Sequence, residues 1–280
     1  MHANEPGLAG FYMQKWRLTS VGPAIQTPTS SLFPVTRNNN ALMLKIIKEE
    51  GDEQNSCTAL LHYSGVGAVN VFEHTDDAFV MQRAVAGKTL KMFRAEQGDE
   101  KTTRIISDVL KQLHCAPSSK SEVNLPNLKT LQGAFAAMRG INKRALPLPV
   151  LEHAETLFDS LIASTSHHSV LHGDLHHDNL LLDQDDRWLA IDPKGFLGDP
   201  IYDCAALFKN PLDDDGVADE TCIFSRADIL QEQLGYSRDR ILQWAFVHCV
   251  LSVIWSVQDG APIGPAQSVA MALFQMLYRD

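Results

Sequence analysis

The chain has 280 residues, 45% of them hydrophobic, so it is long and apolar enough to bury one large core or two modest ones. This composition excludes a disordered or fibrous protein. The formal net charge of −10, from 34 acidic and 24 basic residues, argues against nucleic acid as the main partner and favours a neutral or cationic one.

Short runs typical of β-strands occupy the first eighty or so residues. They are residues 31–35, 41–47, 68–72 and 78–82. Because three consecutive asparagines, 38–40, join the first two runs, we expect an antiparallel hairpin there. Apolar residues at helical spacing predict one helix in this part of the chain, over residues 52–63.

After Gly87 the pattern changes to that of helices. Apolar residues recur on one helical face through residue 113, with Asp99 as the expected N-cap, and again over 147–163. The change predicts an α+β protein of two lobes: a small antiparallel β-sheet lobe with one main helix (residues 1–84) and a larger, mostly helical lobe (residues 85–280). A cleft between two lobes is a common ligand site.

The cellular setting follows from the cysteines and the apolar segments. Five scattered cysteines without a C-x-x-C pair indicate neither a disulfide framework nor a zinc knuckle, so we expect a cytoplasmic protein. The N-terminus lacks the basic and apolar segments of a secretory signal. The longest apolar stretch, residues 241–257, is interrupted by polar residues and predicts a buried core helix, with no membrane partner.

The most informative segment is H-G-D-L-H-H-D-N at residues 172–179. Two apolar runs follow it, predict a second hairpin and end at Asp192. Asp174 and Asn179 on a loop before this hairpin, with Asp192 at its far end, can converge three oxygen groups on one point. Phosphoryl transfer needs this arrangement, because magnesium neutralises charge while one carboxylate receives the hydroxyl proton. We therefore predict Asp174 as the catalytic base, with Asn179 and Asp192 holding Mg2+.

These motifs carry a family resemblance. The spacing of Asp174 and Asn179 matches the kinase loop H-R-D-x-x-x-x-N, with Gly173 in place of the arginine. With I-D-P at 191–193, it resembles the aminoglycoside phosphotransferase family of the protein-kinase-like fold. The full loop, I-D-P-K-G at 191–195 and K-N-P at 209–211 resemble more narrowly its streptomycin and hydroxyurea kinase branch, from about residue 31 to the C-terminus.

The resemblance implies ATP as the phosphate donor, a nucleotide-binding N-terminal lobe, and a catalytic and substrate-binding C-terminal lobe. It implies that Lys45 contacts the ATP phosphates and that Glu53 is its ion-pair partner, with Glu49 and Glu50 as competitors.

The phosphate-covering loop is expected over residues 29–40, which contain no G-x-G-x-x-G. Ser30 and Ser31 would cap the phosphates there through hydroxyl and backbone N–H groups.

The substrate is expected to be a small molecule, and the charge of the chain permits a cationic one. Residues 174–220 contain thirteen acidic side chains against three basic ones, which predicts a negative surface near the cleft mouth. The resemblance implies phosphorylation of a hydroxyl on an aminoglycoside such as streptomycin, or on hydroxyurea. Sequence gives no indication of the oligomeric state.

Three alternatives stay open at this point. A kinase for another small alcohol or amine, such as choline, a sugar or homoserine, would keep the mechanism. A metal-dependent hydrolase would use the histidines and aspartates of 172–178 as ligands. A nucleotide-binding pseudokinase would account for the missing glycine-rich loop.

Several acidic and imidazole groups are expected to be structural. Asp199 and Asp203 would cap the next helix, the aspartates at 213–215 would form a solvated loop, and His176 and His177 would shape the catalytic loop.

Overall fold

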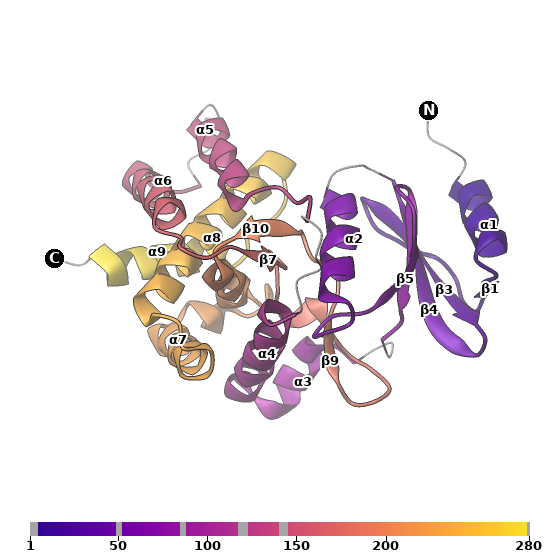
Figure 1. Cartoon of the computed structure of the whole chain (residues 1–280). Helices are drawn as coiled ribbons and strands as arrows, with labels where there is room; N and C mark the ends of the chain where they lie inside the picture. The colour runs from indigo at the N-terminus through magenta and orange to yellow at the C-terminus, as the bar shows by residue number, and fades with distance from the viewer. Residues whose placement is uncertain (1–4, 49–51, 85–87, 117–122, 140–144, 279–280) are drawn as a thin grey trace.

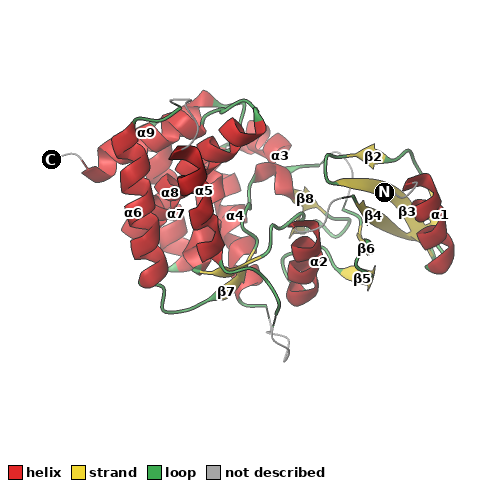
Figure 2. Ribbon diagram, turned by 90° about the horizontal axis from the view of Figure 1, so that it is seen from above, coloured by secondary structure: helices red, strands yellow, loops and turns green. Residues whose placement is uncertain are grey.

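The computed structural model describes residues 5–48, 52–84, 88–116, 123–139 and 145–278. The chain forms a sheet lobe and a helical lobe, and helix α2 lies between the sheet and the helical lobe in both views (Figures 1 and 2). The predicted α+β, two-lobed fold is confirmed. The boundary predicted between residues 84 and 85 adjoins residues outside the described part and stays a prediction.

The sheet lobe is a twisted antiparallel sheet in the order β1-β3-β4-β6-β5, with β2 paired to β3. Its elements are α1 (Glu5–Lys15), β1 (Thr19–Ser20), β2 (Ile25–Gln26), β3 (Ser30–Arg37), β4 (Asn40–Ile47), α2 (Asp52–Tyr63), β5 (Val71–His74) and β6 (Ala78–Gln82). The predicted hairpin is confirmed, because Asn38 and Asn39 adopt the positive φ angles of 52° and 64° that a tight turn between β3 and β4 requires.

Two local predictions in this lobe need correction. The strand expected at 68–72 begins at Val71, and Ala68 instead bridges to Ala190 of the helical lobe. Helix α1 was not predicted from sequence. Tyr12 on this helix and Trp16 just after it pack onto the apolar face of the sheet.

The helical lobe surrounds one long apolar helix. Its elements are α3 (Leu90–Gln97), α4 (Asp99–His114), η1 (Leu128–Gln132), α5 (Gly133–Arg139), α6 (Leu148–Ala163), β7 (Ser169–Leu171), η2 (His177–Asn179), β8 (Leu180–Leu182), β9 (Trp188–Ala190), β10 (Phe196–Gly198), η3 (Pro200–Lys209), η4 (Asp215–Ala218), α7 (Glu220–Leu234), α8 (Arg238–Asp259) and α9 (Ala266–Tyr278). Helix α8 is long and apolar enough to cross a membrane, but 67% of its apolar window is buried in this lobe, so it is the predicted core helix.

Contacts between the lobes fix the segment that precedes the H-G-D motif. Leu60 and Tyr63 on α2 belong to the same apolar core as the helical lobe. The Tyr63 hydroxyl donates to the Val170 carbonyl at 3.3 Å, on strand β7. Strand β7 also pairs with β10, so it is held from two sides and the loop that follows it starts from a fixed position.

Candidate active site

The H-G-D turn needs a glycine at its centre. Gly173 has a φ of 81°, and a Cβ there would lie 2.9 Å from the ring of Phe196 and 3.2 Å from Cβ of Lys194. A side chain at this position would be strained in its backbone and would clash with strand β10. This packing is the physical reason why glycine, and not arginine, precedes Asp174.

A buried carboxylate holds the turn in place. Asp203 is 1% exposed, and its two oxygens accept the backbone N–H groups of His172 at 3.0 Å and Gly173 at 2.7 Å. His114 Nε2 lies 3.0 Å from the same carboxylate. The prediction that Asp203 caps a helix is wrong, because both its oxygens face a loop that precedes it by thirty residues in the chain.

Asp199 is the cap that sequence predicted. Its Oδ1 accepts the N–H of Ile201 at the start of η3, and its Oδ2 accepts the indole N–H of Trp244 at 2.8 Å. Arg240 also donates to this carboxylate at 2.7 Å. The group therefore ties the start of η3 to the core helix α8.

Two nitrogen groups flank the Asp174 carboxylate. His176 Nε2 lies 3.8 Å from Oδ2, and Lys209 Nζ lies 3.9 Å from Oδ1. Burial alone would raise the pKa of Asp174, but nearby positive charge, above all that of Lys209, outweighs burial and lowers it. Asp174 is therefore a carboxylate at neutral pH.

The other two predicted oxygen ligands lie near Lys45. Asn179 Nδ2 donates to the Asp174 carbonyl at 2.9 Å, which leaves the amide oxygen of Asn179 for another partner. Asp192 has a φ of 57°, an uncommon conformation for a non-glycine residue, and its Oδ1 accepts from Lys45 Nζ at 2.8 Å. Burial raises the pKa of Asp192, but Lys45 outweighs this effect and lowers it.

These residues line two cavities. The smaller one has a volume of about 260 Å³ and the larger one of about 600 Å³. The smaller cavity is lined by Thr27, Pro28, Thr29, Ser30, Leu32, Lys45, Ser56, Leu60, Phe79, Met81, Asn179, Ile191 and Asp192. The larger is lined by Asn55, Pro126, Thr130, Leu131, Gly173, Asp174, Lys194, Phe196, Tyr202, Lys209, His248, Trp255 and Asp259. Asp174 thus faces the larger cavity, while Lys45, Asn179 and Asp192 face the smaller.

The expected phosphate-covering loop has a different structure. Residues 30–37 form strand β3, and the turn beside the smaller cavity is the short one at 27–29, between β2 and β3. The Ser30 hydroxyl lies 2.9 Å from that of Thr27 and lines the cavity, whereas Ser31 donates to Gln26 Oε1 at 2.7 Å.

The predicted partner of Lys45 lies at the edge of the described residues. Glu53 belongs to helix α2, but its side chain, with Glu49 and Glu50, lies outside them. The ion pair that the structure describes for Lys45 is the one with Asp192.

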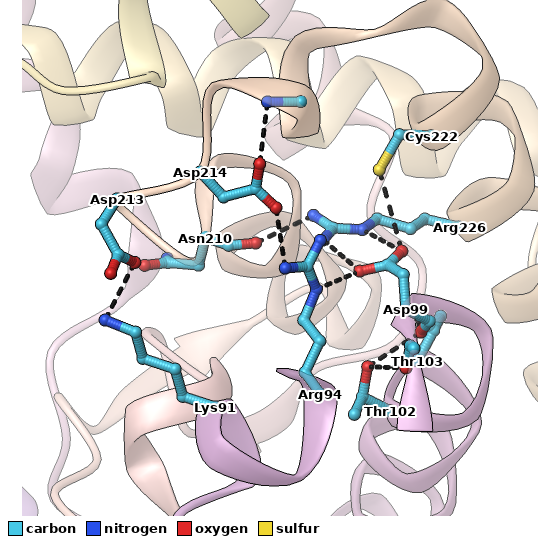
Figure 3. A network of polar contacts seen from close by, with 12 residues as sticks. Lys91, Arg94, Asp99, Thr102, Thr103, Asn210, Asp213, Asp214, Cys222 and Arg226 are labelled. Carbon is cyan, nitrogen blue, oxygen red and sulfur yellow. Dashed lines mark hydrogen bonds and ion pairs between the residues drawn. The ribbon is translucent and has the colours of Figure 1, made fainter. Parts of the chain in front are cut away.

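Most of the acidic side chains at 174–220 do not line the larger cavity. Of its thirteen acidic side chains, only Asp174 is part of that wall, where Lys194 and Lys209 accompany it. Others form ion pairs elsewhere: Asp213 with Lys91 at 2.9 Å and Asp214 with Arg94 at 2.7 Å (Figure 3). The aspartates at 213–215 are therefore not simply a solvated loop, because two of them tie it to helix α3.

The sequence predicted Asp99 as the N-cap of helix α4, but the N-cap is Gly98 and Asp99 is the first residue of the helix. Its carboxylate instead accepts from Arg94 at 2.6 Å and from buried Arg226 at 2.6 and 2.9 Å (Figure 3). This pairing lowers the pKa of Asp99 despite burial, which opposes it.

The histidines of the loop do not form a metal cluster. Among the described residues, no three or more His, Cys, Asp or Glu side chains come together as metal ligands. His172 Nε2 lies 2.9 Å from the Ile191 carbonyl, and His176 accepts the N–H of Asp178 at the start of η2. His177 is buried, and its ring nitrogens contact no polar group in the described part of the chain. Their positions do not support the hydrolase alternative.

Sequence reasoning missed several residues of this site. Asp203, Lys209, His248 and Asp259 were not singled out as site residues, and no local motif marks any of them except the K-N-P string that begins at Lys209. Lys209, His248 and Asp259 line the larger cavity and Asp203 holds the turn beside it, and only the fold brings them together.

Comparison with known proteins agrees with this geometry. Solved structures of the same fold include choline kinase LicA from Streptococcus pneumoniae, with a TM-score of 0.64 and 15% identity over 97% of this chain and 98% of that one. Aminoglycoside phosphotransferase APH(4)-Ia, in a complex with ADP and hygromycin B, has a TM-score of 0.60 and 14% identity over 94% of each chain. These likenesses show the protein-kinase-like fold.

Sequence relatives are closer. Streptomycin 3''-kinase of Klebsiella pneumoniae is 32% identical over 271 residues, which cover 95% of this chain and 99% of the relative. Hydroxyurea phosphotransferase of Kitasatospora aureofaciens is 26% identical over 275 residues, covering 95% of this chain and 77% of the relative. The family model for aminoglycoside/hydroxyurea antibiotic resistance kinases matches residues 15–260. The chain therefore belongs to the aminoglycoside/hydroxyurea antibiotic resistance kinase family and is a small-molecule kinase.

Proposed function

We propose that the protein transfers the γ-phosphate of ATP to a hydroxyl of a small molecule. This molecule is either an aminoglycoside, such as streptomycin, or hydroxyurea. The observation that carries the proposal is the position of Asp174 in the larger cavity, next to a smaller cavity that contains Lys45, Asn179 and Asp192. Donor and acceptor thus have separate compartments on the two sides of one carboxylate loop.

The smaller cavity suits the nucleotide phosphates. Lys45 supplies a buried positive charge, and Ser30 on the short turn supplies a hydroxyl. The amide oxygen of Asn179 and Oδ2 of Asp192 are hard oxygen ligands of the kind that Mg2+ prefers. When bound, Mg2+ would neutralise negative charge on the phosphates. The lowered pKa of Asp192 keeps this ligand ionised.

Asp174 acts on the acceptor. An ionised carboxylate accepts a hydrogen bond from the attacking hydroxyl and orients its oxygen towards the donor cavity. Because phosphoryl transfer passes through a loose transition state, the hydroxyl proton can move late, and a carboxylate of low pKa is an adequate base. His172 and Gly173 hold this carboxylate in place through their bonds to Asp203.

The substrate class rests on the relatives and on the size of the larger cavity. A volume of about 600 Å³ is within the range of small-molecule sites. Asp259 at the end of α8 provides an exposed negative group for a cationic part of the substrate. Lys194 and Lys209 in the same wall also permit a neutral alcohol such as a simple sugar, and Asp259 permits a small cationic alcohol such as choline, so kinases for these acceptors are the second candidate.

The test is ATP turnover with magnesium across streptomycin, other aminoglycosides, hydroxyurea, choline and simple sugars, with the product mass determined. Phosphorylated streptomycin or hydroxyurea supports the proposal. Turnover only with choline or a sugar keeps the mechanism and replaces the substrate. ATP binding without turnover of any acceptor favours the pseudokinase.

The role of Asp174 has its own test. We expect Asp174→Asn to lower kcat by about 10²- to 10⁴-fold, the usual contribution of a catalytic base, with ATP affinity nearly unchanged. Asp159→Asn, which neutralises an exposed carboxylate on α6, is the matched control. An Asp174→Asn enzyme with the activity of this control would overturn the assignment.

A further inference from the structure

The larger cavity contains an ammonium group that donates no hydrogen bond within the described part of the chain. Lys209, the last residue of η3, is 8% exposed and lines the cavity. Its nearest described carboxylate oxygen, Asp174 Oδ1, is 3.9 Å away, beyond hydrogen-bonding distance, and Lys209 Nζ donates to no other described residue. An ammonium carries three N–H donors, and Lys209 Nζ stays accessible from the cavity. An acceptor oxygen of a cavity ligand can therefore bind there.

The backbone around Lys209 is held by a separate network. Arg226, fully buried on α7, donates from Nη1 to the carbonyls of Leu207 at 2.6 Å and Asn210 at 3.0 Å, one on each side of Lys209. Asp99 fixes Arg226 in turn (Figure 3). This support fixes the backbone from which the Lys209 side chain extends, so less of the chain has to be ordered when a ligand binds.

The other groups facing the cavity define what Lys209 can bind. Lys194 adds a second positive charge, and Asp259 adds a negative one. His248 is buried, and burial lowers its pKa to about 3, so it is neutral. Its Nδ1 lies 2.9 Å from the Tyr202 hydroxyl, while its Nε2 contacts no polar group among the described residues. The wall beside Asp174 is therefore rich in nitrogen groups, and its remaining carboxylate is Asp259.

We propose that Lys209 binds an acceptor oxygen of the substrate, next to the hydroxyl that faces Asp174, and so determines substrate specificity. The oxygen is a carbonyl, hydroxyl or ether oxygen, and an ammonium or guanidinium group at this position is rejected. A cationic part of the substrate lies instead near Asp259. This inference rests on the proposed role of the larger cavity as the acceptor site. Lys45 serves the donor side, so Lys209 contacts the acceptor and not the nucleotide.

Two small ligands of similar size test the inference without turnover. Hydroxyurea, one of the acceptors proposed above, has a carbonyl next to its N-hydroxyl group. In N-hydroxyguanidine a nitrogen replaces this carbonyl oxygen, and the resulting guanidine group is largely protonated at neutral pH. With a non-hydrolysable ATP analogue and Mg2+ present, calorimetry should show wild-type protein binding hydroxyurea about 10- to 100-fold more tightly, the effect of a hydrogen bond to a charged group. Equal binding, tighter binding of N-hydroxyguanidine or no binding of hydroxyurea overturns the proposal.

Variants separate Lys209 from the rest of the cavity. Lys209→Met should remove the preference for hydroxyurea, and Lys209→Arg should keep part of it. Lys101→Met, at an exposed lysine on α4, should leave it unchanged. A preference retained in Lys209→Met overturns the role of Lys209. Thermal unfolding checks that each variant is folded. If Lys209→Met does not fold, the comparison of the two ligands on wild-type protein still tests the proposal.

Kinetics distinguish acceptor binding from contact with the phosphoryl group. In any acceptor that is turned over, Lys209→Met should raise the acceptor KM by about 10- to 100-fold, with the KM for ATP unchanged. A lower kcat with an unchanged acceptor KM would assign Lys209 to the phosphoryl group and overturn the proposal. Because the calorimetric preference needs no turnover, a failure of phosphoryl transfer and a failure of the Lys209 site are told apart.

Discussion

The substitution Asp203→Asn tests whether the H-G-D turn is held by one buried carboxylate. Asp203 accepts from the N–H groups of His172 at 3.0 Å and Gly173 at 2.7 Å, one with each oxygen. An asparagine keeps the shape and one acceptor oxygen, but it turns an NH2 group towards the other N–H. The variant therefore loses one charge-assisted hydrogen bond and leaves a buried donor facing a donor.

The magnitude follows from those two changes. A hydrogen bond to a charged group contributes about 1.5–3 kcal/mol, and a buried unsatisfied N–H costs about 1–3 kcal/mol, so we expect a loss of at least about 2.5 kcal/mol. For a chain of this size, that loss lowers Tm by at least about 5 °C. A shift of about 1 Å in the catalytic carboxylate lowers kcat by about 10²-fold. Binding of ATP, which we place in the smaller cavity, should be nearly unchanged.

The assays are thermal unfolding, and turnover of whichever acceptor the panel identifies. Asp108→Asn, which neutralises an exposed aspartate on α4, is the matched control. The reasoning is refuted if Asp203→Asn has the Tm and kcat of this control, since the turn would then be held by other contacts.

Three further predictions concern the turn, the donor side and the stability. Gly173→Ala should lower Tm and kcat together, because φ is 81° and the added Cβ would lie 2.9 Å from Phe196; an alanine variant with wild-type Tm contradicts this. Asp192→Ala should weaken ATP binding in the presence of magnesium by about 10-fold, which a nucleotide titration at several magnesium concentrations measures. Burial lowers the pKa of His177 from 6.5 to about 3, so between these values the unfolded chain binds a proton that the folded chain does not. The free energy of unfolding should therefore fall by up to about 1.4 kcal/mol per pH unit as the pH drops through this window. His177→Phe should reduce that slope in denaturant titrations, while the same change at exposed His167 should not.

Local patterns predicted the parts of the fold that depend on neighbouring residues. The turn at Asn38 and Asn39 needs residues that tolerate positive φ, and helix α2 needs only its own apolar spacing. Asp174 and Asn179 lie on one short loop, so their spacing alone brought them near each other. Asp192 was placed with them because a hairpin returns the chain to the same end.

The parts that sequence did not predict depend on distant partners. Asp203 faces a turn about thirty residues earlier, and Arg226 meets Asp99 across 127 residues. A count of acidic residues also cannot tell an ion-paired aspartate from one in a cavity wall. Asp213 and Asp214 contributed to the predicted negative surface, yet they pair with Lys91 and Arg94. Composition alone therefore does not predict which charges line the larger cavity.

The two sides of the site are built in different ways. On the acceptor side, η3 is tied at its start by Asp199 and at its end by Arg226, and between them it carries Asp203 and Lys209. One element therefore sets both the position of the catalytic turn and the position of the ammonium beside it. On the donor side, the described ion pair between the lobes is that of Lys45 with Asp192. Changes in the sheet lobe should therefore affect nucleotide binding first, whereas changes along η3 should affect the choice and orientation of the acceptor.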